Sequence, residues 1–111
     1  IRIEQILTNL LSNGLRYTPQ GGTIQVGMQG NGPEVTVTVH DSGPGIPEES
    51  LPYVFERFYR ADKARARAEG GSGLGLAIAR QLARAHGGEL TAGNDPQGGA
   101  VFMLRLPVAR R

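Results

Sequence analysis

The sequence contains no cysteine and no tryptophan, and only one of its twelve basic residues, Lys63, is a lysine. Without cysteine the chain cannot form disulfides, zinc–thiolate sites or a cysteine nucleophile. Aromatic residues make up only 5% of the sequence and are not interleaved with basic residues, which disfavours stacking on nucleic-acid bases. No apolar run approaches the roughly 20 residues that cross a bilayer, and the first residues do not form a secretory signal.

What remains is the composition of one globular domain. The 111 residues are 39% hydrophobic and 20% charged, which is enough to bury one core. Helical spacing predicts helices over 2–17 and 73–86, and the second helix is expected to bury one face, formed by Leu74, Ile78, Leu82 and Ala85. Further segments are a short helical piece at 48–59 and strands at 23–28, 34–40, 89–93 and 100–107, the first two strands being joined by a loop at 29–33. This order predicts an α+β fold with helices on one face of a largely antiparallel sheet.

Polar side chains interrupt the first predicted helix. Asn9, Asn13 and Arg16 all lie roughly 130° from the apolar stripe at 100° per residue. Asparagine in a helix interior costs up to about 0.7 kcal/mol relative to alanine, which favours a polar site over plain helix surface. Amide oxygens are hard neutral ligands that suit Mg²⁺, and the metal would in turn hold phosphates. A solvated polar face is the alternative.

Asp41 is in phase with the valines of the strand at 34–40. A carboxylate on the buried side must find hydrogen-bond donors or lose its charge. Gly43 and Gly45 let the backbone approach a ligand closely. The carboxylate suits the 6-amino group of adenine and would reject guanine, which carries a carbonyl at that position. The alternative is that Asp41 closes its strand with an Asx turn.

A glycine-rich turn at 70–76 opens the second helix. Free N–H groups at a helix N-terminus can hold phosphate, although such turns are common. No lysine follows, so the turn is not a Walker A loop, and no strand is predicted before it, which disfavours a Rossmann fingerprint.

Other polar residues carry no evident chemistry of their own. His40 is predicted to face away from the valines of its strand. Arg80 and Arg84 are predicted to be solvated charges on the outer face of the second helix.

Four motifs occur in order along the chain: Asn9-Leu-Leu-Ser-Asn13-Gly-Leu-Arg16-Tyr17, Asp41-Ser-Gly43-Pro-Gly45, Phe55-Glu-Arg57-Phe58-Tyr59-Arg60 and Gly71-Ser-Gly73-Leu-Gly75-Leu. Together they resemble the N, G1, F and G2 boxes of the catalytic ATP-binding domain of sensor histidine kinases, within the GHKL superfamily. The resemblance covers nearly the whole chain and implies a two-layer α/β sandwich of the Bergerat type over residues 1–111. Members usually carry one or two strands before the first helix, so this chain is expected to lack part of the sheet.

The resemblance also implies a role for each matching residue of the first two motifs. Asn13 would coordinate Mg²⁺, and Asn9 would lie close to the metal and the phosphates. Arg16 would contact phosphate, and Tyr17 would lie against the base. Asp41 would bind the adenine amino group, with access given by Gly43 and Gly45.

The last two motifs are expected to surround the phosphates. Arg57 and Arg60 match the arginines of the F box, and Arg60 is the better candidate for the γ-phosphate. Residues 61–72 would form a lid. The phosphates would be bordered by the glycine-rich turn, through Gly71, Gly73, Leu74 and Gly75.

The implied function is that of a protein-histidine kinase in a two-component phosphorelay. The domain would bind MgATP and present its γ-phosphate to a histidine on a separate helical dimerisation domain, with a response regulator as an indirect partner. Neither His40 nor His86 matches that phosphoacceptor, so the chain is not expected to phosphorylate itself. The implied location is the cytoplasm, whether or not the full-length protein is anchored in the inner membrane. Binding to nucleic acid and direct membrane insertion of this domain are not expected.

Three alternatives remain. ATPases of the gyrase, mismatch-repair and chaperone branch carry a glutamate where Asn9 stands, and an amide cannot serve as the general base. An anti-sigma-type serine kinase would share the pocket, but the complete F box weighs against it. A nucleotide-free scaffold fragment is the third alternative, and the intact motifs weigh against that one.

Overall fold

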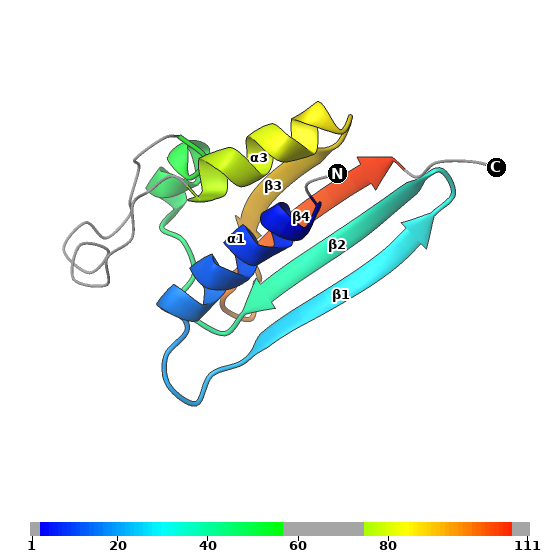
Figure 1. Ribbon diagram of the computed structural model, residues 1–111. Helices are drawn as coiled ribbons and strands as arrows, with labels where there is room; N and C mark the ends of the chain where they lie inside the picture. The colour runs from blue at the N-terminus through cyan, green and yellow to red at the C-terminus, as the bar shows by residue number, and fades with distance from the viewer. Residues whose placement is uncertain (1–2, 57–74, 108–111) are drawn as a thin grey trace.

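The computed structural model describes residues 3–56 and 75–107 (Figure 1). Within these ranges the elements follow in the order α1 (Ile3–Tyr17), β1 (Ile24–Asn31), β2 (Glu34–Asp41), the 3-10 helix η1 (Glu48–Tyr53), α3 (Gly75–Ala85), β3 (Glu89–Asn94) and β4 (Ala100–Pro107). The predicted lid, the end of the helical piece at 48–59 and the first two residues of the helix at 73–86 lie outside the described residues. The predicted helices and strands are otherwise present with shifted ends.

The four strands form one sheet in the order β1-β2-β4-β3, and all three pairings are antiparallel. This confirms the predicted hairpins. The predicted loop at 29–33 is wrong, because β1 continues to Asn31 and only Gly32 and Pro33 separate it from β2. Gly32 has a φ of 64°, which a glycine adopts without strain and which allows so short a connection.

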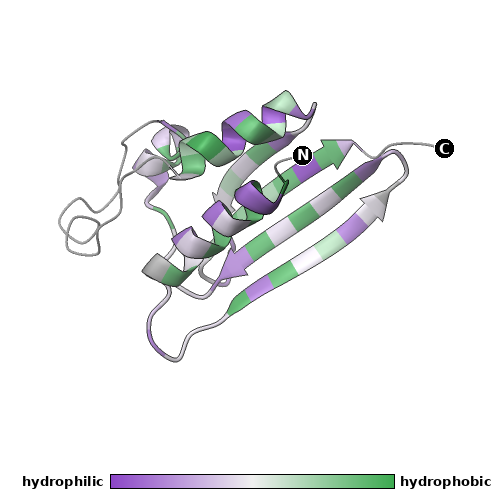
Figure 2. Ribbon diagram, viewed as in Figure 1, coloured by the Kyte–Doolittle hydropathy of each residue, from purple (hydrophilic) through white to green (hydrophobic). Residues whose placement is uncertain are grey.

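Helices α1 and α3 cover one face of this sheet, so the molecule has two layers (Figure 1). Hydrophobic and hydrophilic residues alternate along β2 and β4 (Figure 2), and the residues of β4 are alternately buried and more exposed. The inward set meets one side of each helix. The resulting core contains Ile6, Leu10, Val37, Val39, Ala79, Ala83, Leu90, Ala100, Phe102, Leu104 and Leu106.

The buried face of α3 agrees only in part with the predicted one. Leu82 of the predicted face packs against the core, but the completely buried residues are Ala79 and Ala83, and Ile78 is 40% exposed. Both stripes of this helix contain apolar residues, so spacing alone does not decide which one faces the core. The side of α3 that carries Ala79 and Ala83 faces the core, because these small side chains let α3 pack closely beside α1 and the sheet.

Arg80 and Arg84 were predicted to be plain solvated charges, and this is also wrong. The Nε atoms of both arginines lie 3.2 Å from Oε1 of Glu89. Arg80 also covers the ring of Phe55 at 5.0 Å, and this ring meets Phe102 edge-on at a centroid distance of 6.2 Å. The hydrogen bond from Arg84 is the largest of several effects that lower the pKa of Glu89 to about 2. The cluster ties the segment after η1 to α3 and β3.

No helix in the described ranges is both long and apolar enough to span a membrane.

Candidate functional site

Asp41 is the last residue of β2 and lies on the face that the helices cover, where it is only 5% exposed. Its Oδ1 accepts hydrogen bonds from the N–H of Gly43 at 2.9 Å and from the N–H of Ala100 at 3.3 Å. The predicted donors are therefore present, and the bond from Gly43 is also the Asx turn that the sequence left as the alternative. Among the described residues, both hydrogen bonds go to Oδ1. The second carboxylate oxygen accepts no hydrogen bond from these residues.

The loop after Asp41 is held at its far end by Asn94 of β3. The N–H of Ile46 donates to Oδ1 of Asn94 at 2.7 Å, and Nδ2 of Asn94 donates to the carbonyl of Ile46 at 2.7 Å. Gly45 lies directly against this amide with a φ of 83°, and an added Cβ would stand 2.9 Å from Oδ1 of Asn94. The glycine that was expected to give a ligand access is therefore also required for a contact within the protein.

Ser42 fastens the start of β1 beside Asp41. Its Oγ accepts from the N–H of Thr23 at 2.8 Å, and its own N–H donates to the carbonyl of Thr23 at 3.0 Å. A Cβ on Gly22 would meet Oγ of Ser42 at 2.6 Å, so this approach requires glycine. The methyl group of Thr18 also lies against Gly22, and the hydroxyl of Thr18 is buried without a hydrogen-bond partner among the described residues.

The asparagines of α1 differ in how much of their amide is already used. Nδ2 of Asn9 donates to the carbonyl of Gly75 at 3.0 Å, and its Oδ1 accepts from Nε2 of Gln5 at 3.0 Å. Asn9 thereby joins α1 to the first residue of α3, which brings the first and fourth motifs together. Asn13 is half-buried one turn further on and makes no hydrogen bond with a described residue. Its amide is therefore the freer of the two candidate ligands for Mg²⁺.

Several predicted site residues cannot be placed. Arg16 and Tyr17 belong to the last turn of α1, but the directions of their side chains lie outside the description. Also outside the described residues are Arg57, Arg60, Gly71, Gly73 and Leu74. Within the described ranges no group of three or more histidine, aspartate or glutamate side chains could hold a metal ion.

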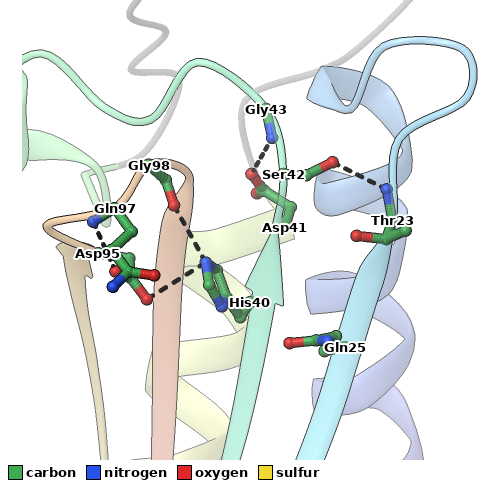
Figure 3. Close-up of a pocket in the computed structure, with 9 residues that line it drawn as sticks. All are labelled: Thr23, Gln25, His40, Asp41, Ser42, Gly43, Asp95, Gln97 and Gly98. Carbon is green, nitrogen blue, oxygen red and sulfur yellow. Dashed lines mark hydrogen bonds and ion pairs between the residues drawn. The ribbon is translucent and has the colours of Figure 1, made fainter.

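A cavity of about 280 Å³ borders Asp41 on the other face of the sheet (Figure 3). His40 faces this cavity, away from the valines as predicted, and its Nε2 lies 3.1 Å from the carbonyl oxygen of Gly98 and 3.5 Å from Oδ2 of Asp95. The cavity is smaller than most ligand sites, which span roughly 300–1,000 Å³. It also lies on the far side of the sheet from Asn9 and Asn13, so it is not the site that the four motifs predict.

Comparison with known protein families shows which family this domain belongs to. Residues 1–110 match the family described as histidine kinase-, DNA gyrase B- and HSP90-like ATPases. The chain belongs to this ATPase family.

Its similar relatives are sensor kinases. The domain is 52% identical over 106 residues to the signal transduction histidine-protein kinase AfsQ2 of Streptomyces coelicolor, covering 96% of this chain and 19% of that protein. It is 44% identical over 109 residues to the histidine-protein kinase BaeS of Escherichia coli, covering 98% of this chain and 23% of that protein. The chain thus spans about a fifth of the length of these relatives. It corresponds to the catalytic ATP-binding domain of protein-histidine kinases.

Solved structures agree with the fold. The mycobacterial sensor histidine kinase MprB superposes with a TM-score of 0.83 at 38% identity, over 93% of this chain and 70% of that chain. Full-length ShkA in complex with AMPPNP superposes with a TM-score of 0.81 at 32% identity, over 99% of this chain and 22% of that chain. The predicted α+β sandwich of the GHKL type is confirmed.

Sequence reasoning missed two contributors to the candidate site around Asp41. Asn94 holds Ile46 in the loop after β2 from 48 residues away, and the N–H of Ala100 reaches Asp41 at the end of β2 from 59 residues away. An asparagine at a strand end and an alanine carry no local signal of such a role. Only the antiparallel pairing of β4 with both β2 and β3 could have suggested it.

Proposed function

We propose that this domain binds MgATP and presents the γ-phosphate to a histidine on a separate helical dimerisation domain. The observation that supports this most directly is the carboxylate of Asp41. Two backbone N–H groups fix one of its oxygens, and the other accepts no hydrogen bond from a described residue. The similar relatives are histidine kinases, and one of the similar structures is a kinase in complex with AMPPNP, an ATP analogue.

The fixed carboxylate explains a preference for adenine. Adenine carries an amino group at position 6, which donates to a carboxylate oxygen, whereas guanine carries a carbonyl oxygen there. Two acceptors facing each other in a partly buried site would each lack a donor, and this costs about 1–3 kcal/mol per unsatisfied group. ATP should therefore bind in preference to GTP.

The phosphate end is assigned to α1 and to the glycine-rich turn. Asn13, whose amide makes no hydrogen bond with a described residue, would hold Mg²⁺, while Asn9 keeps the start of α3 against α1. When bound, the metal neutralises charge on the phosphates. As further parts of the proposal, Tyr17 lies against the base, and the phosphates are contacted by Arg16, Arg57, Arg60, Gly71, Gly73, Leu74 and Gly75.

The chemistry of the domain is placement. Phosphoryl transfer needs an aligned donor and acceptor and stabilised charge, and little covalent work by the protein. Asn9 stands where a water-activating glutamate would be needed for hydrolysis, and an amide cannot take a proton from water as a general base would. The attacking imidazole therefore comes from the partner domain, and transfer to histidine is favoured over hydrolysis.

The proposed partners follow from this chemistry. The dimerisation domain of the same kinase supplies the histidine, and a response regulator receives the phosphoryl group afterwards. Among the similar structures, the histidine kinase ThkA is in complex with the response regulator protein TrrA. Because ATP is cytoplasmic, the domain is proposed to work on that side of the membrane.

Isothermal titration calorimetry of the 111-residue chain tests the proposal. ATP and ADP should bind with micromolar to millimolar dissociation constants in the presence of Mg²⁺, and GTP should bind more weakly. Omitting Mg²⁺ should weaken ATP binding. A chain that is folded by circular dichroism yet binds neither ATP nor ADP would show that the proposed function is wrong.

A further inference from the structure

We propose that Asn94 is a positioning residue for the base subsite, holding the loop 43–46 in the shape that fixes Asp41. The inference rests on the proposed function, since it concerns how the same site recognises its nucleotide. Asn94 belongs to none of the four motifs and lies on β3.

The geometry of the contact is specific for an amide. Asn94 both accepts from the N–H and donates to the carbonyl of Ile46, with two distances of 2.7 Å. The amide thereby imitates the backbone of a neighbouring strand. In a hydrogen-bonded antiparallel pair, a residue likewise exchanges one N–H···O bond in each direction with its partner. A carboxylate of the same shape could only accept, and an apolar side chain could do neither.

The loop between the two anchors is short, so fixing its end restricts its beginning. At the beginning, the N–H of Gly43 donates to Oδ1 of Asp41, and at the end Asn94 holds Ile46. The same region of the sheet reaches Asp41 a second time, because Asn94 pairs with Ala100, whose N–H also donates to Oδ1 of Asp41. Asn94 and Asp41 are therefore coupled through two routes, the loop and the β3–β4 pairing.

Gly45 shows how closely the loop is fitted to Asn94. Its φ of 83° is left-handed, and a Cβ would stand 2.9 Å from Oδ1 of Asn94. A side chain at position 45 would push the loop away from β3. The close approach therefore depends on glycine, as the second glycine of the motif Asp41-Ser-Gly43-Pro-Gly45 supplies.

The energetic role of Asn94 is to raise the population of the binding-competent loop. If the loop adopts this shape only a tenth of the time without the amide, the apparent affinity falls about tenfold. ATP binding should lose more than GTP binding, because only adenine donates to the carboxylate that Gly43 orients and GTP therefore gains little from the competent loop. A general loss of stability would weaken ATP and GTP binding alike.

Two variants with a matched control test the proposal. Asn94→Asp keeps the shape and the acceptor but loses the donor, and Asn94→Leu loses both. Thr91→Val alters an exposed residue on the same strand, outside the loop contact. Calorimetric dissociation constants for MgATP and MgGTP are measured together with the amide hydrogen exchange of Ile46. We expect both Asn94 variants to bind ATP about tenfold more weakly, to discriminate less against GTP, and to exchange the Ile46 amide faster, while Thr91→Val matches the wild type.

The outcomes separate this inference from the function on which it rests. If the wild type binds ATP and Asn94→Asp keeps its affinity, its discrimination and its Ile46 protection, Asn94 has no positioning role and only the inference is wrong. Equal weakening of ATP and GTP would likewise contradict it, since that pattern indicates lost stability. If the wild type binds no nucleotide, both fail together. Should Asn94→Leu not fold, Asn94→Asp decides alone.

Discussion

Replacing Asp41 by asparagine changes one oxygen of the proposed base subsite into an NH₂ group and leaves the shape unchanged. The amide oxygen can take the place of Oδ1, where it still accepts from the N–H of Gly43 and of Ala100. The new NH₂ group then stands where the ligand-facing oxygen stood. A donor thus replaces the acceptor that is proposed to read the adenine amino group.

The magnitude follows from hydrogen-bond energetics. A hydrogen bond to a charged acceptor contributes about 1.5–3 kcal/mol, and about 1.4 kcal/mol corresponds to tenfold in affinity. Loss of the bond should therefore weaken ATP binding by about 10- to 150-fold, and the facing donors push the result toward the upper end. Guanine gains a partner, because its carbonyl at position 6 can accept from the new amide. The preference for ATP over GTP should therefore disappear or reverse.

Folding should survive in Asp41→Asn. The two backbone donors keep an acceptor and lose only its charge, so the free energy of unfolding should fall by about 1–2 kcal/mol. Asp41→Ala would instead leave two N–H groups without an acceptor, at about 1–3 kcal/mol each. The asparagine variant therefore tests recognition with less damage to the fold.

The assay is calorimetric titration of wild type and Asp41→Asn with MgATP and MgGTP, with urea unfolding of both proteins as the folding control. If Asp41→Asn bound ATP within twofold of the wild type and kept the same preference over GTP, the carboxylate would not be reading the base. The assignment of the base subsite to Asp41 would then have to be abandoned.

Three other predictions concern different parts of the domain. Lowering the pH from about 5 to 2 should remove stability that depends on ionised Glu89, because its pKa in the folded domain, about 2, lies below the ordinary value of 4.5. Since the partner Arg84 is half-exposed and therefore partly screened by solvent, the loss in unfolding free energy should be only about 1 kcal/mol. Urea unfolding at the two pH values measures this loss, which should be missing in Glu89→Gln. Gly99→Ala should destabilise the domain by about 3 kcal/mol, because φ at Gly99 is 88° and the new Cβ would overlap the backbone oxygen of Asp41. In the control Gly93→Ala the new Cβ would meet no atom within 4 Å, so the unfolding free energy should change by less than about 1 kcal/mol. The isolated chain should hydrolyse ATP far more slowly than about 1 per second, the low end of ordinary enzyme turnover, and a phosphate-release assay near that rate would contradict the reasoning on Asn9.

The parts of the fold that could be predicted are those whose signal is local. Alternation along 34–40 continued to Asp41 and placed this carboxylate on the buried side, where the structure has it. In the apolar stripe of the first helix, Ile6 and Leu10 are completely buried as the spacing predicts, whereas Leu11 is 37% exposed. In both cases the residues that decide the outcome are neighbours in the sequence.

The errors have the opposite origin. The buried face of α3 depends on how closely α1 approaches, which the sequence of α3 does not encode. Ala79 and Ala83 are therefore the completely buried residues, and Leu82 packs beside them only partly buried. Arg80 and Arg84 were read as solvated because their partner Glu89 lies on the next strand, after the turn at Gly87. Polar and glycine residues near Asn31 concealed the end of β1, which is set by pairing with β2.

The site itself shows why its remote parts escape prediction. Its polar contacts are made largely by backbone groups, those of Gly43, Ile46 and Ala100, and any residue type other than proline carries such an N–H. What the sequence constrains instead is the absence of side chains, since a Cβ on Gly99 would overlap the backbone of Asp41 and one on Gly45 would crowd Asn94. The proposed binding of the base and the packing of the β3–β4 turn therefore share the same few atoms. Substitutions in that turn should change nucleotide selectivity and stability together, although none of its residues is proposed to touch the ligand.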